Sequence, residues 1–452
     1  MSNAERKSQE SVAAVASEPV AAARPLDFEP ASDRRNHNVF RYPAKFHPPI
    51  ANKLIEMFSK AGETVLDPFC GSGTLLVEAA VLGRNSIGTD VDPLAVFIAG
   101  AKARYYEMDV IGRHMATLIG RLNDLRALDA EKWGSFEDDI DEISQRVALE
   151  ELIAYVPHLP KIEHWFRRRV VVQLAQIRRE ILSPEFEMAD TFFKLCFGSI
   201  IRNASNADPV PVSGLEVTSH MLRKEEAGRS IDPFKLMVRA LTRIFEATKG
   251  FEEAREASAR VVVREADARH LNLDDLSVPD AAITSPPYLT AVDYYRRHTL
   301  EMYWLGLTDT TAERLDIMPR YIGRDRVGNK HLPTADEMAA SEVVDRWLKR
   351  FPDIKPHRKN AFIHYCDGMS RALARMAEVV KPGGPIVIVA GDVRFCGQPV
   401  SMLELMTDLS RDILTMTDHL WYPIVNRYMS YTRHNEANIA ADHVLVFRQK
   451  EG

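Results

Sequence analysis

Cysteine is scarce in this 452-residue sequence, and long apolar runs are missing. The few cysteines stand far apart, so we expect neither a paired zinc motif nor a disulfide framework, and a reduced, cytoplasmic setting. The sequence has no run of about 18 apolar residues, which argues against a membrane-spanning helix. Its N-terminus lacks the basic start and apolar core of a secretory signal. The cysteines are Cys70, Cys196, Cys366 and Cys396.

An excess of positive charge is also lacking. The formal net charge is -6, which argues against a protein that coats nucleic acid with a uniformly basic surface. A local basic cleft remains compatible with this charge, because the field at a binding site depends on nearby residues. Hydrophobic residues make up 46% of the chain, as in ordinary globular proteins. The length allows one large domain with insertions, or two domains.

The order of apolar patterns predicts an α/β sheet that starts after a disordered leader. Residues 1–35 are rich in Ala, Glu, Ser and Pro without apolar periodicity, so we expect order to begin near His37. A buried strand at residues 63–67, a glycine turn, a helix at residues 74–82 and a second strand follow. Strand, helix and strand in this order form a right-handed parallel unit, which indicates a doubly wound fold.

Two segments interrupt the strand pattern. Residues 109–258 look mainly helical, and we predict that they form a large helical insertion. A second insertion is predicted at residues 305–360. The core domain then comprises residues 36–108 and 259–452. Its later strands are expected at residues 260–263, 281–283, 386–389 and 443–447.

A glycine-rich loop joins the first strand to the first helix, at residues 67–74 with the sequence DPFCGSGT. Glycines let the backbone approach a ligand at the carboxyl edge of the sheet, where α/β folds bind ligands. Asp90 ends the next strand, where an acid commonly accepts hydrogen bonds from a ribose. Asp267 follows a third strand, and it could accept a hydrogen bond from an adenine amino group.

Other ligands suit this loop less well. A nicotinamide dehydrogenase would prefer G-x-G-x-x-G, and a phosphate-binding ATPase loop needs G-K-[ST], and the sequence has neither. The acid at the start of the loop suits a cationic ligand, such as a sulfonium that also carries an ammonium group. The alternative without function is a tight turn.

A second motif, TSPPY at residues 284–288, directly follows a predicted strand. Its prolines fix the backbone and remove two amide donors, which leaves carbonyl groups free to accept hydrogen bonds. Ser285 and the Pro286 carbonyl could orient the delocalised lone pair of an exocyclic amine, and Tyr288 could stack on a base taken out of a duplex. Methyl transfer to that amine then needs mainly positioning. The alternative without function is a proline-rich loop that ends a strand.

Together, the two motifs resemble those of the amino-methyltransferases of DNA, the N4-cytosine and N6-adenine group. A third segment, RYPAKFHPP at residues 41–49, resembles the part of that family that closes over the methionine end of the cofactor. The resemblance implies a doubly wound, mostly parallel, seven-stranded Rossmann-like methyltransferase sheet that binds S-adenosyl-L-methionine and no metal. It implies catalytic roles for Ser285, Pro286, Pro287 and Tyr288, and cofactor contacts for Lys45, Phe46, His47, Asp67, Pro68, Phe69, Gly71, Gly73, Thr74, Asp90 and Asp267.

The resemblance also bears on the substrate. A serine at the position of Ser285 is typical of the N4-cytosine members, and an aspartate is more typical of the N6-adenine members. We therefore expect a site-specific DNA methyltransferase that modifies cytosine N4, in modification or defence, with a cognate restriction or defence protein as a further partner. The alternatives are an adenine-N6 enzyme, an RNA methyltransferase of the tRNA guanine-N2 type, and a regulatory subunit without catalysis.

Basic residues in the two insertions are candidates for contacting DNA phosphates. Residues 167–169 and 178–179 lie in the helical insertion, which is a candidate for target recognition, and a solvated helix face explains them equally well. Residues 293–298, DYYRRH, could line the base pocket or belong to the core, and a lone histidine such as His298 is more often structural. In the second insertion the basic residues are Arg320, Arg324, Arg326, Lys330, Arg346, Lys349, Arg350, Lys355, Arg358 and Lys359.

Overall fold

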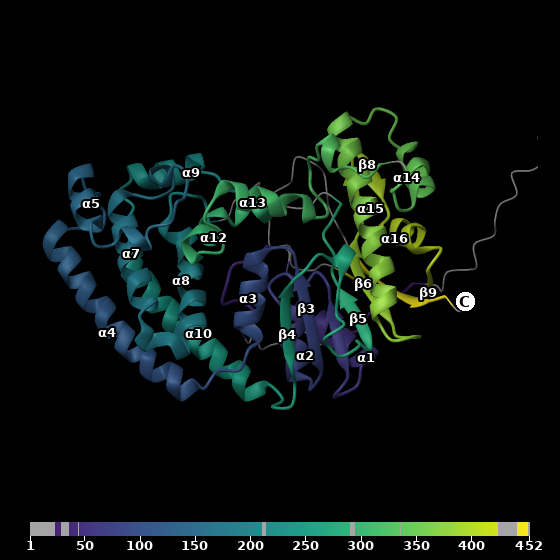
Figure 1. Ribbon diagram of the computed structural model, residues 1–452, viewed down its shortest axis with the longest axis horizontal. Helices are drawn as coiled ribbons and strands as arrows, with labels where there is room; N and C mark the ends of the chain where they lie inside the picture. The colour runs from purple at the N-terminus through teal and green to yellow at the C-terminus, as the bar shows by residue number, and fades with distance from the viewer. Residues whose placement is uncertain are drawn as a thin grey trace, which may run out of the picture.

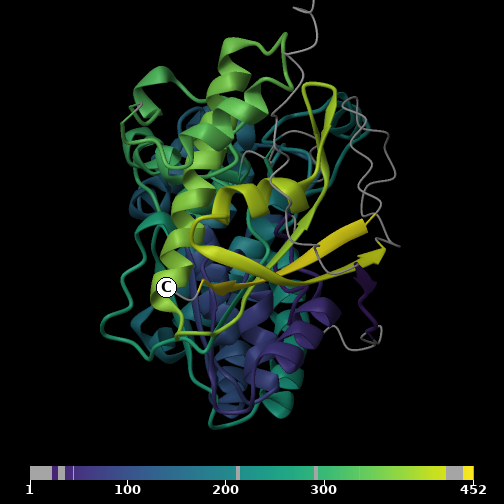
Figure 2. The same ribbon diagram turned by 90° about the vertical axis from the view of Figure 1, so that its right-hand side faces the viewer.

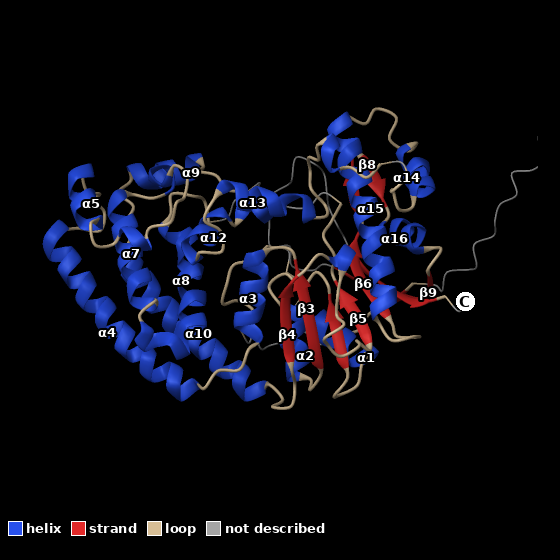
Figure 3. Cartoon of the chain, viewed as in Figure 1, coloured by secondary structure: helices blue, strands red, loops and turns tan. Residues whose placement is uncertain are grey.

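The computed structural model of the chain describes residues 23–28, 36–43, 45–209, 214–289, 294–334, 336–423 and 441–450, without the side chains of Tyr294 and Tyr295. Within these ranges, eight strands form one sheet in the order β1-β9-β10-β6-β5-β2-β3-β4 (Figure 1, Figure 3). β10 is antiparallel to both of its neighbours, and the other pairs are parallel. The strands are β1 (Arg24–Pro25), β2 (Thr64–Asp67), β3 (Asn85–Asp90), β4 (Val261–Glu265), β5 (Ala281–Thr284), β6 (Ile386–Gly391), β9 (Leu414–Pro423) and β10 (Ala441–Gln449). This arrangement confirms the predicted α/β class.

Helices cover both faces of the sheet, which explains why its central strands are continuous apolar runs. All residues of β2, β5 and β6 are buried. On one face, α1 (Pro48–Phe58) and α2 (Thr74–Val81) contribute to an apolar cluster with β2, β5, β6 and β10. On the other face, α15 (Pro356–Val379) and α16 (Met402–Ser410) form a second cluster with the same strands. Figure 2 faces the side of the molecule on which β9 and β10 lie.

The expectation that order begins near His37 is wrong for part of the leader. Arg24 and Pro25 form β1, which pairs in parallel with β9 at the sheet edge. The Leu26 amide donates to the Trp421 carbonyl at 2.7 Å, and the Leu26 side chain is buried. A strand of two residues is too short to show an alternating pattern in the sequence. Pro25 is tolerated there because β1 is the edge strand, where its missing amide donor costs no hydrogen bond to a further strand. This strand raises the sheet from the predicted seven strands to eight.

A helical body lies beside the sheet and fills the chain between β3 and β4 (Figure 1). It has its own apolar core, which also takes in α12 (Thr299–Leu305) and the fully buried Trp304. No helix in the described ranges has both the length and the hydropathy to cross a membrane. The helices in this part of the chain are α3 (Pro93–Ala103), α4 (Met108–Trp133), α5 (Glu142–Leu149), α6 (Ile162–Trp165), α7 (Arg168–Ile181), α8 (Asp190–Ala204), α9 (Ser219–Glu226) and α10 (Pro233–Ala254).

The second insertion connects the two bodies. α11 (Tyr294–Arg297) and α12 lead into α13 (Thr311–Ile317), which lies near the helical body in Figure 1, and the chain then crosses to α14 (Ser341–Leu348) beside α15. The Trp347 indole donates to Asp408 of α16 at 2.7 Å. Beyond β6, a small hairpin is formed by β7 (Val393–Phe395) and β8 (Gln398–Val400).

The first basic cluster is largely structural. Arg167 binds Glu225 at 2.5 Å, and the Arg169 guanidinium binds Asp129 at 2.7 Å with both side chains almost fully buried. A buried carboxylate is tolerated only when it is paired and hydrogen-bonded, which is what Arg169 provides. Phosphate contact by Arg167 and Arg169 is therefore a wrong prediction, whereas Arg168 is exposed.

We expect the Arg169→Met variant to be destabilised by about 3–5 kcal/mol, because it leaves the buried Asp129 carboxylate without its guanidinium. The neighbouring Arg168→Met variant is the matched control, since Arg168 is exposed and its loss should change stability by no more than about 0.5 kcal/mol. Urea denaturation of both variants measures the difference. Equal losses in the two variants would contradict a structural role for the buried pair.

Candidate active site

The glycine loop is shaped by two left-handed residues between β2 and α2. Gly71 has φ +48° and Gly73 has φ +76°. A Cβ added to Gly73 would lie 2.8 Å from the Ala99 Cβ, so that position must stay glycine for packing as well as for conformation. The buried Lys102 donates from Nζ to the Ser72 carbonyl at 2.7 Å and supports the loop from behind. Sequence reasoning missed Lys102, because a lysine in a helix is ordinarily exposed.

Asp67 ends β2 beside the catalytic motif on β5. The Thr284 hydroxyl donates to its carboxylate at 2.6 Å, and the Phe69 amide donates at 3.2 Å. Only 3% of Asp67 is exposed. Burial raises the pKa of Asp67 to about 7, against the opposing effect of these hydrogen bonds. This carboxyl group therefore favours a cationic ligand as its next partner.

Asp90 ends β3 next to the same loop. The Gly71 amide donates to one of its carboxylate oxygens at 2.9 Å, and the Asp92 amide donates to the other at 3.0 Å. Burial raises the pKa of Asp90 to about 7, and the nearby Asp92 and Asp67 act in the same direction. The carboxyl ends of neighbouring parallel strands thus bring two acids to one edge, as the sequence predicted.

The catalytic motif leaves β5 at Thr284 and lies over this edge. Ser285, Pro287 and Tyr288 are partly exposed, and Pro286 is buried. The hydroxyl group of Tyr365, on α15, donates to the Pro287 carbonyl at 3.1 Å and so fixes the second proline. Tyr365 was not predicted, because a tyrosine inside an apolar helix carries no signal that distinguishes it from the core.

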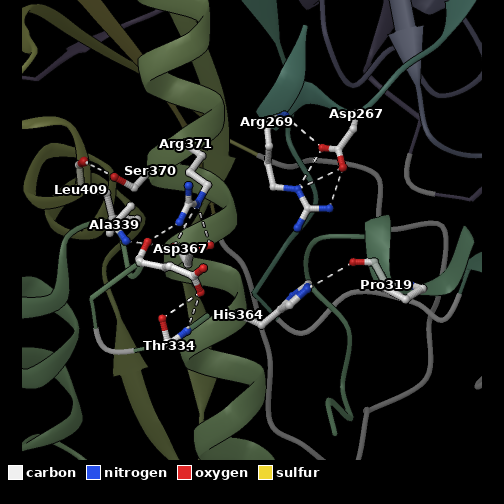
Figure 4. Close-up of polar contacts among 11 residues, drawn as sticks. Asp267, Arg269, Pro319, Thr334, Ala339, His364, Asp367, Ser370, Arg371 and Leu409 are labelled. Atoms are coloured by element: carbon white, nitrogen blue, oxygen red, sulfur yellow. Dashed lines mark hydrogen bonds and ion pairs between the residues drawn. The ribbon is translucent and has the colours of Figure 1, made fainter. Parts of the chain in front are cut away.

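Asp267 lies at the same edge, but its carboxylate is already engaged. Arg269 donates to both of its oxygens, with the shortest contact at 2.6 Å (Figure 4). Burial acts to raise the pKa of Asp267, but the hydrogen bonds and charge of Arg269 outweigh it and lower the pKa overall. Any ligand amino group must share this carboxylate with Arg269.

Two adjoining cavities lie between these motifs, and Ser285 lines both of them. The larger has a volume of about 720 Å³, counting its opening to solvent, and the smaller about 300 Å³ on the same measure. All of the predicted site residues except His47 and Gly73 line one or both. The smaller cavity is lined by Tyr42, Lys45, Phe46, Asp67, Phe69, Cys70, Gly71, Ser72, Thr74 and Ser285. The larger is lined by Tyr42, Pro68, Phe69, Gly71, Asp90, Val91, Asp267, Ala268, Ser285, Pro286, Pro287, Tyr288, Arg320, Tyr321 and Ile322.

The segment before α1 closes one side of the smaller cavity. Lys45 donates from Nζ to the carbonyl groups of His37 and Phe40, at 2.7 and 2.8 Å. Burial, followed by the charges of nearby arginines, lowers the pKa of Lys45 to about 8. His47 is the N-cap residue of α1 and packs its ring against Phe28, which explains why it lines neither cavity.

The second insertion supplies a wall of the larger cavity that sequence reasoning did not find. Ile322 packs so closely on α15 that a Cβ added to Gly368 would lie 2.9 Å from its Cγ1. Figure 4 shows α15 holding other parts of the insertion, where Asp367 accepts from the Ala339 amide at 2.9 Å and His364 contacts the Pro319 carbonyl at 3.4 Å. The sequence signal for this wall was the face of α15 that carries Gly368 with the polar His364 and Asp367, because such a face accepts close packing by another segment.

No group of three or more His, Cys, Asp or Glu side chains in the described residues could hold a metal ion. The residues that line the two cavities offer acids, the basic side chains of Lys45 and Arg320, carbonyl groups, hydroxyl groups and aromatic rings.

Comparison with known proteins points to one family. A family model described as DNA methylase (N6_N4_Mtase) matches residues 9–99. The type II methyltransferase M.MvaI of Kocuria varians is 24% identical over 62% of this chain, and the match covers 60% of its own length. M.BsoBI of Geobacillus stearothermophilus is 23% identical over 83% of this chain and 78% of its own. A tRNA (guanine(10)-N2)-dimethyltransferase of Methanothermobacter thermautotrophicus is 38% identical, but over only 13% of this chain and 18% of its own.

The raised pKa values of Asp67 and Asp90 predict how stability depends on pH. Between about pH 4 and pH 7 the unfolded chain loses these protons while the folded chain keeps them, so the free energy of unfolding should fall as pH rises, by up to about 1.4 kcal/mol per unit for each carboxyl group. Asp67→Asn should make this fall shallower. Asp275→Asn should not, because the pKa of that exposed carboxyl group is lowered by Arg264. Thermal unfolding at several pH values measures the slopes, and an unchanged slope in Asp67→Asn would contradict the assignment.

Proposed function

This chain is a member of the amino-methyltransferase family, and from that premise we propose that it transfers a methyl group from S-adenosyl-L-methionine to the N4 amine of cytosine in DNA. The observation that carries the proposal is the position of Ser285, which lines both cavities. The smaller cavity lies at the glycine loop, and the larger runs from Asp90 and Asp267 to Pro286, Pro287 and Tyr288. The methionine end of a donor in the smaller cavity, with its ribose and adenine at Asp90 and Asp267, would meet an acceptor beside Tyr288 at this residue.

The residues around the glycine loop fit the cofactor. The described contacts of Asp67 and Asp90 come from a hydroxyl group and backbone amides, and none comes from a basic side chain. The buried Asp67 and the partly exposed Asp90, with no basic side chain among these contacts, suit the cationic groups of this cofactor, which when bound supplies a methyl group on a sulfonium. The residues that would hold its methionine part are Lys45, Phe46, Asp67, Phe69, Gly71, Gly73 and Thr74, with Asp90 at the ribose and Asp267 at the adenine.

The catalytic motif would act by orienting the amine. The Ser285 hydroxyl and the Pro286 carbonyl accept its two N–H bonds, which turns the lone pair away from the ring plane and towards the donor. Pro287 is held by Tyr365, so the Pro286 carbonyl sits in a rigid segment. Tyr288 provides an aromatic face for a base taken out of the duplex. Positioning of this kind requires no covalent intermediate with the protein.

Cytosine is favoured over adenine by Ser285 alone, through the family resemblance, and adenine N6 is the alternative. DNA is favoured over RNA by two features. The matches to the type II methyltransferases M.MvaI and M.BsoBI extend over 62% and 83% of the chain, whereas the tRNA methyltransferase match covers 13%. Among the described residues, the second insertion also exposes several cations a few residues after those that line the larger cavity, as described below. A role in modification or defence, with a partner restriction protein, belongs to the same proposal.

The second insertion carries the surface that we assign to DNA phosphates. Residues 320–322 line the larger cavity, and Arg326 and Lys330 follow them as exposed residues. The side-chain amide of Asn360 donates to the side-chain oxygen of Asn329 at 2.7 Å. This contact brings the start of α15, with the exposed Lys355 and Lys359, close to Lys330. Other cations of the insertion bind carboxylates instead: Arg320 to Glu265, Arg346 to Asp408, Arg350 to Glu404 and Arg358 to Asp325.

The reaction is tested by incubating the protein with DNA and labelled S-adenosyl-L-methionine, followed by mass spectrometry of the hydrolysed nucleosides. We expect N4-methylcytosine. N6-methyladenine would change the base, and label in RNA alone would refute DNA as the substrate.

The Ser285→Ala/Tyr288→Ala variant should lose transfer and still bind the cofactor, because neither residue holds the methionine or ribose part. Loss of cofactor binding in this variant would show that the acceptor site is misplaced.

The DNA surface is tested by salt dependence. Lys355→Ala/Lys359→Ala should weaken binding to all DNA sequences and lower the slope of log Kd against log salt by about 2, because two phosphate contacts are lost. Lys235→Ala/Lys249→Ala removes two exposed cations from α10 and should leave the slope unchanged. Fluorescence anisotropy with a labelled duplex measures both. Equal changes in the two variants would place the DNA elsewhere.

A further inference from the structure

A buried polar cluster lies directly behind the larger cavity and is not part of the proposed chemistry. Its centre is Asp92, which is 1% exposed and is the N-cap residue of α3. One carboxylate oxygen accepts from the amides of Leu94 and Ala95, at 2.9 and 3.4 Å. The other accepts from His298 Nδ1 at 3.1 Å and lies 3.5 Å from the Tyr42 hydroxyl. Asp92 thus joins three segments that are far apart in the sequence.

Tyr42 connects this cluster to the site. Its ring lies 4.8 Å from the His298 ring, with 37° between their planes. Tyr42 also lines both cavities, and its Cε1 would lie 3.4 Å from a Cβ added to Gly71. The ring therefore covers the left-handed turn of the glycine loop.

His298 connects the cluster to the chain that follows the catalytic motif. It is 2% exposed, and its carbonyl accepts from the Met302 amide at 3.0 Å to begin α12. On its other side, α12 is held to α8, where Arg202 lies 3.3 Å from Glu301. The first turn of α12 is thus held from two sides, by Asp92 of α3 through His298 and by Arg202 of α8 through Glu301.

From these contacts we infer that Asp92, His298 and Tyr42 form a positioning unit that holds the start of α12, which follows the catalytic motif along the chain, in register with the cofactor edge; this inference rests on the proposed function. Backbone amides connect this unit to the glycine loop. The Asp92 amide donates to one carboxylate oxygen of Asp90, and the Gly71 amide donates to the other. His298 lines neither cavity, so it acts through Tyr42 and Asp92 and does not exchange a proton with the substrate. Small displacements of reacting groups cost large factors in rate, which gives such a unit its purpose.

The unit is tested by replacing His298 in two ways in the full chain. His298→Leu removes the donor to Asp92 and leaves a buried carboxylate oxygen short of a partner. His298→Asn keeps an N–H at a similar place. We expect His298→Leu to raise the Kd for S-adenosylhomocysteine about tenfold and to lower kcat about 30-fold, and His298→Asn to stay within about threefold of the wild type in both. Titration calorimetry and steady-state kinetics on DNA measure the two quantities.

A control in the same helix separates positioning from general destabilisation. Leu300→Val trims a fully buried apolar side chain of α12 in the core of the helical body and keeps the His298–Asp92 hydrogen bond, so it should lower the melting temperature and leave Kd and kcat within about twofold. Failure of the asparagine to rescue, or an equal kcat loss in Leu300→Val, would overturn the inference.

A double-mutant cycle covers the case in which His298→Leu does not fold. Tyr42→Leu combined with His298→Ala, which removes both the ring and the donor to Asp92, should change the Kd for S-adenosylhomocysteine by at least about threefold less than the product of the single changes, because the two side chains act as one unit. Multiplicative effects would overturn the inference. These Kd values are measured without nucleic acid, so they test the positioning unit even if the wild type methylates no DNA. Absence of DNA methylation by the wild type would refute only the proposed function.

Discussion

A buried hydrogen bond from Thr284 to Asp67 ties together the ends of the two central strands, β5 and β2. One of these strands leads into the glycine loop and the other into the catalytic motif, so the bond sets the distance between them. Because Asp67 is almost fully buried, its carboxyl group has few alternatives to this partner. The raised pKa of Asp67 and the shared position of Ser285 at both cavities are consequences of the same crowded edge.

Much of this edge could be predicted from the sequence, for a simple geometric reason. Carboxyl ends of neighbouring parallel strands meet, so Asp67, Asp90 and Ser285 had to come together once β2, β3 and β5 were recognised as strands. The strands themselves were visible because burial on both faces demands continuous apolar runs. The glycine loop could be recognised because its glycines cannot be replaced: Gly73 is left-handed and lies against Ala99, so no side chain fits there.

The remaining features depend on contacts that no local pattern encodes. β1 exists because β9 offers it an edge, and Tyr365 matters because α15 passes over Pro287. Charge was misleading in the helical body, where Arg169 turned out to face the buried Asp129. An arginine beside other arginines looks the same in a sequence whether it faces solvent or a buried acid. Only the packing of α7 against α4 decides between them.

The two insertions therefore contribute to the site in different ways. The helical body reaches it indirectly, through the contact between Arg202 and Glu301 that holds α12. The second insertion reaches it directly, because Tyr321 and Ile322 line the larger cavity and Gly368 lets them approach α15. The same insertion exposes Arg326 and Lys330 a few residues later. The wall of the cavity and the exposed cations therefore belong to one segment, whose position is set by its packing on α15.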